Sequence, residues 1–468
     1  MRIEHDFLGE LNIPDNAYYG VQSLRGSQNF NITGQRLDSD FIVALATVKK
    51  AAAMANMSTE RLDKKIGDAL VQAADEIISG KLHDEFIVDP IQGGAGTSIN
   101  MNTNEVLCNR ALEIIGEEKG RYDIISPNNH ANMAQSTNDA FPTAIKLCII
   151  LKARKLRDAL NYLITELENK SVEFKDVLKM GRTHLQDAVP ITLGQEMASY
   201  ASSVKRGLNR IDHALINLHY INMGGTAIGT GLNAEPKYIP EVAKILSELT
   251  NEEFHVAENL IDATNNTDGF ADISSALKNT ALVLIKMAND FRLMASGPRC
   301  GLNELKLPAR QPGSSIMPGK INPVIAEVLD QTCYQVIGND AVVSLGVENG
   351  QFELNVMEPV IAFNIFNSLK YMTNAINTFV NNLLLDLKAN EEQCAYWLNN
   401  SVGTITALLP HIGYENASMI AKEAYQTNKP VRDIILDKQL LTVEKLDIIL
   451  SPKEMTKPGI AGEELLNK

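Results

Sequence analysis

Five stretches of the chain carry apolar residues at the three- and four-residue spacing of long amphipathic helices. Two of them start near Pro142 and Pro190, and the others span about Ile273 to Met294, Pro323 to Leu345 and Pro359 to Leu387. Each is roughly 22 to 32 residues long, or about 33 to 48 Å at the helical rise. Helices of this length cannot all cover their apolar stripes inside one chain. The sequence therefore predicts a mainly α protein whose bundle continues across subunits.

Breaks in the pattern predict three domains. A glycine-rich break lies at 89–97 and a polar break at 126–139, and a shorter, more charged region follows Lys388. We expect an N-terminal domain at 1–138, a central bundle of five long helices at 139–390 and a small helical C-terminal domain at 391–468. Runs of Val and Ile that alternate with helices are missing from the sequence, which disfavours a doubly wound sheet.

Composition excludes several kinds of partner. The formal net charge is −14, which disfavours nucleic acid and anionic membrane surfaces. No apolar stretch approaches the roughly 20 residues that span a bilayer, and the first residues lack the apolar core of a signal peptide. The five cysteines are scattered and form no C-x-x-C pair, which suits a reducing compartment. We expect a cytoplasmic protein with no membrane or nucleic-acid partner.

The segment from Gly313 to Pro323 reads GSSIMPGKINP, and it combines hydroxyls, an amide and one ammonium in a glycine and proline frame. A nucleotide phosphate loop has four residues between its two glycines, whereas five separate Gly313 from Gly319. In addition, Ile321 occupies the position of the serine or threonine that would bind magnesium. A solvated turn remains one interpretation. A mobile loop that closes around a small anion is the interpretation we favour, with Lys320 as counter-charge to a carboxylate.

Further polar clusters lie at predicted helix starts and turns. Ser136, Thr137 and Asn138 precede the helix at Pro142. Asn138 or Asp139 is expected to cap this helix, and its free N–H groups are expected to bind a carboxylate; both roles are possible at once. His184 lies in a polar turn, where a surface histidine bonded to a carboxylate such as Asp187 is the alternative to a functional role. Metal ligation is not expected, since no histidine follows His184 at the spacing of a metal pair.

These motifs together resemble the aspartase/fumarase superfamily, and the resemblance covers essentially the whole chain. Within the superfamily, Thr97-Ser98, Met357-Glu358-Pro359 and the late Pro458 to Gly462 segment are most similar to the aspartase branch. The segments that carry the resemblance, in chain order, are 94–105, 135–139, 181–188, 313–323 and 352–359.

The resemblance implies a homotetramer with a twenty-helix core, in which each active site draws residues from three subunits. It implies conversion of L-aspartate to fumarate and ammonia, with no cofactor and no metal. The β-carboxylate would be bound by Thr97, Ser136, Thr137 and Ser315; the α-carboxylate by Thr183, Lys320 and Asn322; and the amino group by Asn138 and His184, with help from Thr97. Ser314 is the implied general base. His184, oriented by Glu327 across a subunit interface, is the alternative base.

Other activities remain open at this point. A class II fumarase would hydrate fumarate to malate with the same base and anion pocket. Argininosuccinate and adenylosuccinate lyases need a larger pocket. A catalytically silent helical oligomer is a further alternative, against which the intact set of Ser314, His184, Lys320 and Asn322 argues.

Overall fold

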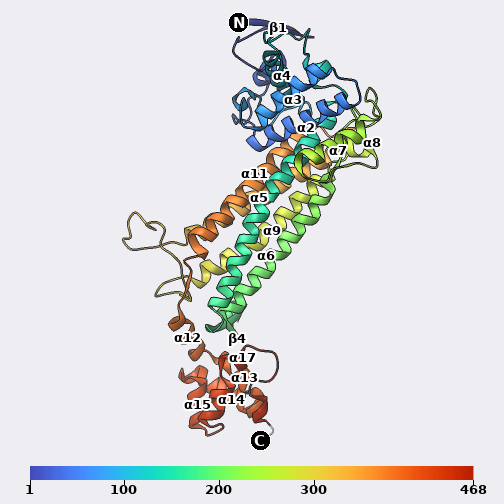
Figure 1. The fold of residues 1–468 in the computed structure, drawn as a ribbon. Helices are drawn as coiled ribbons and strands as arrows, with labels where there is room; N and C mark the ends of the chain where they lie inside the picture. Colours follow the sequence, from blue (N-terminus) through green and yellow to red (C-terminus); the bar gives the residue numbers. More distant parts are fainter. Residues whose placement is uncertain (467–468) are drawn as a thin grey trace. The chain divides into compact units, whose positions relative to one another are not determined.

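The computed structural model describes residues 1–466 and is predominantly helical (Figure 1). It divides into two compact units, and both take segments from the same long helices. Unit 1 comprises Met1–Asp158, Gly207–Ala281 and Tyr334–Thr373, and unit 2 comprises Ala159–Arg206, Leu282–Cys333 and Asn374–Lys468, of which 467–468 lie outside the described residues.

The prediction of a mainly α protein with five long helices is confirmed. The helices are α5 (Thr137–Glu173), α6 (Leu193–Ile216), α9 (Asp268–Met294), α10 (Val324–Glu348) and α11 (Glu358–Phe379). A π-helical turn, Val380–Leu384, extends α11. The first helix starts before Pro142, which lies inside α5 and leaves one carbonyl of the first turn without its helical partner.

Unit 1 begins with an antiparallel hairpin of β1 (Arg2–Asp6) and β2 (Gly9–Ile13). Helices α2, α3 and α4 pack around alanine-rich faces, because small side chains allow close approach. The remaining elements of the unit outside the long helices are α1 (Val21–Asn29), α2 (Ser39–Ser58), α3 (Lys64–Ile78), a short helix (His83–Glu85), α4 (Thr97–Ile114), a π-helical turn (Pro127–Ala131), a short helix (Asn217–His219), β5 (Tyr220–Ile221), α7 (Tyr238–Thr250), β6 (His255–Val256) and α8 (Leu260–Asn265). Strands β5 and β6 pair in parallel.

Polar contacts tie the long helices to one another inside unit 1. Ser274 on α9 donates to Asp340 on α10 at 2.8 Å, and Asn339 on α10 donates to Ser368 on α11 at 2.9 Å. These side chains are almost fully buried, so each pair satisfies polar groups that would otherwise destabilise the bundle.

Unit 2 combines the other segments of the long helices with a hairpin of β3 (Leu178–Thr183) and β4 (Gln186–Thr192). A separate apolar core holds the C-terminal helices and includes Leu408, Ile420 and Ile434. The other elements are β7 (Leu305–Lys306), β8 (Lys388–Ala389), α12 (Glu391–Asn400), a short helix (Val402–Thr404), α13 (Ile405–Ile412), α14 (Tyr414–Thr427), α15 (Val431–Asp437), α16 (Val443–Ile449), α17 (Pro452–Met455) and a last short helix (Glu463–Leu465).

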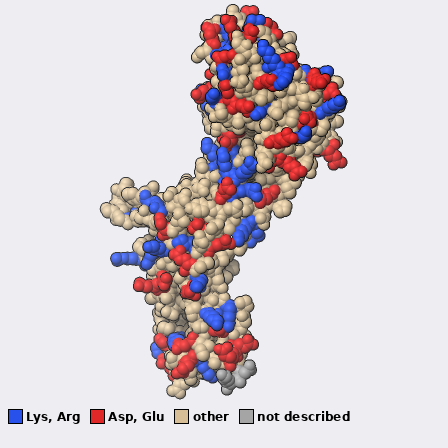
Figure 2. All heavy atoms as spheres, viewed as in Figure 1, with Lys and Arg blue, Asp and Glu red and all other residues tan. Residues whose placement is uncertain are grey.

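The surface carries mixed charge. Figure 2 shows acidic and basic side chains interspersed over the visible face. Among residues 1–466, no helix combines the length and the apolar character needed to cross a membrane. The three-domain division at 138 and 390 stays a prediction.

Candidate active site

Two side chains cap the start of α5. Ser136 Oγ accepts from the backbone N–H of Asn138 at 3.3 Å, and Asp139 Oδ1 accepts from the backbone N–H of Ser136 at 2.9 Å. Of the two expected caps, Asp139 is present, whereas the Asn138 side chain donates to the Ala227 carbonyl and Ser136 provides the second capping bond. Thr137, the first residue of the helix, is buried beside them. This reciprocal pair holds the backbone of the turn in one conformation.

The start of α4 lies against the start of α5. Gly96 precedes α4 with φ of 88°, and a Cβ there would lie 2.6 Å from the Phe141 ring of α5. Only glycine permits both this backbone conformation and this approach. Thr97, the first residue of α4, is exposed, and its hydroxyl donates to the Gly94 carbonyl at 2.7 Å. The structure thus places Thr97 and the Ser136–Asn138 turn on two helix starts that pack together.

Thr183 and His184 lie at the tip of the β3–β4 hairpin in unit 2. His184 and Leu185 form its two-residue turn with φ of 54° and 60°, a conformation that costs side chains other than glycine roughly 1 to 2 kcal/mol each. His184 is exposed, and the carboxylate of Asp187 accepts from the Ser401 hydroxyl at 2.7 Å. The alternative of a histidine bonded to Asp187 therefore gains no support.

The Gly313–Pro323 segment is a loop closed by its own hydrogen bonds. Gly313 N–H donates to the Lys320 carbonyl at 2.8 Å, and Asn322 Nδ2 donates to the Gly313 carbonyl at 2.7 Å. Ser314 Oγ accepts from the backbone N–H groups of Ile316 at 3.2 Å and Met317 at 3.1 Å. Two N–H dipoles directed at one hydroxyl oxygen favour negative charge on that oxygen. Ser315 and Lys320 on the same loop are exposed.

The predicted residues therefore form three groups. Unit 1 holds Thr97, Ser136, Thr137 and Asn138 at the paired helix starts; unit 2 holds Thr183 and His184 on the hairpin tip, and Ser314, Ser315, Lys320 and Asn322 on the loop that precedes α10. Within each group the side chains are positioned by local hydrogen bonds. Their assembly into one pocket stays a prediction.

Sequence reasoning missed the buried charges behind the α5 start. Lys49 on α2 is 3% exposed, and its ammonium donates to Asn132 Oδ1 at 3.1 Å and Gln135 Oε1 at 2.9 Å. Burial lowers the pKa of Lys49 to about 7, against the attraction of Asp139. Burial likewise raises the pKa of Asp139 to about 7. The only sequence signal was a lysine at an inward position of an alanine-rich helix.

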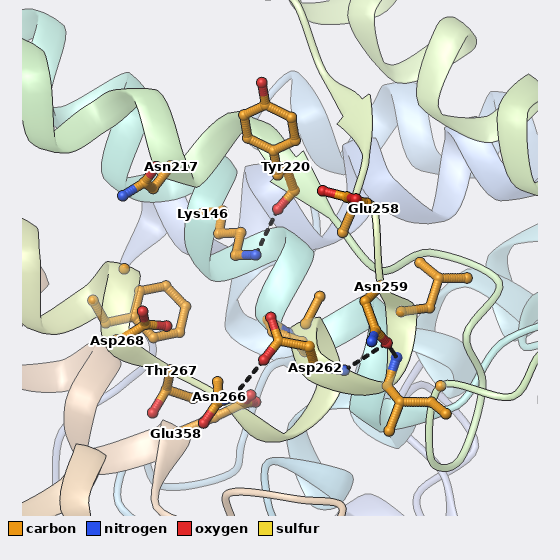
Figure 3. Close-up of a pocket in the computed structure, with 18 of the residues that line it drawn as sticks. Lys146, Asn217, Tyr220, Glu258, Asn259, Asp262, Asn266, Thr267, Asp268 and Glu358 are labelled. Carbon is orange, nitrogen blue, oxygen red and sulfur yellow. Dashed lines mark hydrogen bonds between the residues drawn. The ribbon is translucent and has the colours of Figure 1, made fainter.

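A separate cavity of about 1,050 Å³ lies beside α5 in unit 1 (Figure 3). Lys146 donates to the Tyr220 carbonyl there at 2.6 Å, and burial lowers the pKa of Lys146 to about 8. Glu358 also lines the cavity, and burial raises its pKa. The predicted site residues are not part of this lining. Within 1–466, no group of three or more His, Cys, Asp or Glu side chains is arranged to hold a metal ion.

Known proteins match this chain over essentially its whole length. The lyase family model matches residues 9–338, and the model of the fumarase C C-terminus matches 405–457. Aspartate ammonia-lyase of Bacillus subtilis is 55% identical over 467 residues, covering 100% of this chain and 98% of the relative. Aspartate ammonia-lyase of Helicobacter pylori is 50% identical, with 98% of each covered.

A solved structure described as fumarate lyase:delta crystallin from Brucella melitensis bound to cobalt matches with a TM-score of 0.95. It is 44% identical, and the match covers 98% of this chain and all of that one. The fold and the order of elements are therefore those of known helical lyases.

Proposed function

Because this chain belongs to the aspartase/fumarase superfamily, we propose that it removes ammonia from L-aspartate to give fumarate. One observation carries the assignment: full-length identity of 55% to an aspartate ammonia-lyase. The hydratase alternative is less supported, since the full-length curated relatives described above are both aspartate ammonia-lyases.

The chemical difficulty is the acidity of the β-carbon. Removing its proton places a second negative charge on a substrate carboxylate, so the enzyme must stabilise a dianionic enediolate. The electron pair then forms the carbon–carbon double bond while the Cα–N bond breaks, and ammonia leaves with the bonding pair. Each well-placed oxyanion donor is worth roughly 3 to 4 kcal/mol in such reactions.

Ser314 is the proposed base. A serine hydroxyl is a weak base in water, but the N–H groups of Ile316 and Met317 already point at Ser314 Oγ. These dipoles stabilise the alkoxide, and closure of the loop over substrate would strengthen them by excluding water. We prefer Ser314 to His184 as the base because Ser314 lies on the loop that would close over substrate, and we assign His184 to substrate binding.

Each substrate-binding role draws on two of the three groups of residues. Thr97, Ser136, Thr137 and Ser315 donate to the β-carboxylate, where free N–H groups of the helix starts add to the hydroxyls. Thr183, Lys320 and Asn322 bind the α-carboxylate, and Asn138 and His184 contact the amino group. These assignments rest on the resemblance and on the placement of each residue at a helix start, hairpin tip or loop.

A homotetramer is proposed as the active form. Helix α10 presents an outward stripe of Tyr334, Gly338, Ala341 and Leu345, at the spacing of one helix face, and all four are exposed in the single chain. Leu345 is 59% exposed. An apolar stripe that contains two small residues is suited to close contact with another helix, which supports a core built by four copies.

The cellular location is also part of the proposal. The five cysteines are free thiols, and four of them are buried. Reduced thiols suit a cytoplasmic protein. We further propose the three-domain organisation described above, with the central domain providing the oligomer core.

An absorbance assay tests the reaction. The purified protein should release fumarate from L-aspartate, and in reverse it should consume fumarate when ammonium is supplied. L-malate serves as the control substrate. Fumarate release from malate, together with no release from aspartate, would assign the chain to the hydratases instead.

A further inference from the structure

The amide of Asn138 is held in one orientation. Its Nδ2 donates to the Ala227 carbonyl at 2.7 Å, and a carbonyl can only accept. The nitrogen must therefore face Ala227, which turns Oδ1 the other way. Within residues 1–466, no donor to Asn138 Oδ1 is recorded. An outward acceptor suits a group that can only donate, such as the ammonium of an amino acid.

The backbone of Asn138 is fixed as well. Pro142 has no N–H, so the Asn138 carbonyl cannot form its helical bond. Asn222 replaces that bond, since its Nδ2 donates to the Asn138 carbonyl at 2.9 Å and to Thr264 Oγ1 at 3.0 Å. Asn222 is completely buried, so this substitute is protected from water.

Asp139 connects the same turn to the glycine-rich loop at 224–231. One carboxylate oxygen accepts from Ser136 N–H, as described above. The other accepts from the backbone N–H groups of Gly224 at 3.2 Å and Thr226 at 2.9 Å. Thr226 has φ of 55°, a left-handed conformation that needs such support. Asp139 is 0% exposed, so these bonds are shielded from water.

We infer that Asp139 is a positioning residue for amino-group recognition, because its carboxylate holds the Ala227 carbonyl where it orients Asn138. This inference rests on the proposed function, which gives Asn138 the substrate amino group. It adds that the loop at 224–231 and the buried carboxylate set the preference for an amine through Asn138. The carboxylate-binding residues of the loop before α10 are independent of this link.

The test compares Asp139→Asn with wild-type enzyme, using two ligands. An amide has one acceptor oxygen where the carboxylate has two, so either the backbone N–H of Ser136 or those of Gly224 and Thr226 lose their partner, and the link between the Asn138 turn and the loop is broken. We expect the KM for L-aspartate to rise about tenfold, which corresponds to about 1.4 kcal/mol. Succinate, a dicarboxylate with no amino group, should inhibit with a Ki that rises by no more than about threefold, because it shares the carboxylate contacts of Ser136 and Thr137 but does not use Asn138.

Asp340→Asn is the matched control, since Asp340 is also buried in unit 1 and accepts from Ser274 and Lys278. It should lower thermal stability and leave the ratio of aspartate KM to succinate Ki unchanged. If Asp139→Asn does not fold, Asn222→Ala removes the bond to the Asn138 carbonyl and should move the same ratio in the same direction.

Two results overturn the inference: an equal rise of both constants in Asp139→Asn, or no change in either. A wild-type protein that releases no fumarate from aspartate would instead contradict the proposed function. The two failures are therefore distinguishable.

Discussion

Arg182 donates a 2.8 Å hydrogen bond to Glu304, a carboxylate that is completely buried. Lys179, also on β3, lies 3.2 Å from the other oxygen of Glu304 and 2.9 Å from Glu196. Arg182 immediately precedes Thr183 and His184. The hairpin that carries two predicted substrate contacts is therefore anchored by buried charges next to its tip.

Replacing Glu304 with alanine should strongly destabilise the protein. The change leaves the ammonium of Lys179 and the guanidinium of Arg182 without their shared partner, and breaking a buried ion pair from one side costs about 3 to 5 kcal/mol. Differential scanning calorimetry should show a clear drop in Tm. Glu304→Gln, which keeps an acceptor for Arg182, should lose less. An unchanged Tm in the alanine variant would contradict the anchoring role.

Replacing Ser314 with alanine should abolish turnover and leave assembly intact. If Ser314 Oγ removes the β-proton, kcat should fall at least about 10³-fold, the range for loss of a catalytic base. Size-exclusion chromatography with light scattering should give the wild-type mass. Ser58→Ala, an exposed serine at the end of α2, provides the control. Turnover near the wild-type value in Ser314→Ala would return the role of base to His184.

Stability should depend on pH through the Glu76–Arg110 pair, which links α3 to α4. Arg110 Nε and Nη2 donate to the two oxygens of Glu76 at 2.8 and 2.9 Å. These hydrogen bonds lower the pKa of Glu76 below its ordinary 4.5. A carboxyl whose pKa is lower in the folded state than in the unfolded state stabilises the protein at any pH above its unfolded-state pKa. This stabilisation is lost as the pH falls through the folded-state pKa.

Glu76→Gln should therefore lower Tm at pH 7 by the equivalent of about 1 kcal/mol or less, since the pair is partly exposed. The difference from wild type should shrink as the pH falls below 4.5. Thermal scans from pH 7 to well below pH 4 provide the measurement. Glu248→Gln, an exposed glutamate with no ion pair recorded among residues 1–466, should show no such trend. A difference that grows on acidification would refute the linkage.

The sequence predicted the long helices because their periodicity is a local property. It also placed Ser136 and Asp139 at a helix start, since capping residues act over three positions. The sequence did not predict which residues pair with the buried charges. Glu304 lies more than one hundred residues from Arg182 in the chain, and Lys49 on α2 contacts Gln135 in the turn before α5. Such pairs depend on tertiary packing, which hydrophobic spacing does not specify.

Placing a charge on the outward stripe of α10 should disrupt assembly. Leu345→Glu would bury an unpaired carboxylate if this face contacts another subunit, at a cost of several kcal/mol, or more than about 100-fold in the association constant. Analytical ultracentrifugation should show dissociation, and activity should fall with it if, as the resemblance implies, each site draws residues from several subunits. Tyr425→Glu on α14, where the tyrosine is 84% exposed, should leave both unchanged. A stable, active Leu345→Glu tetramer would mean that the oligomer core uses a different face of α10.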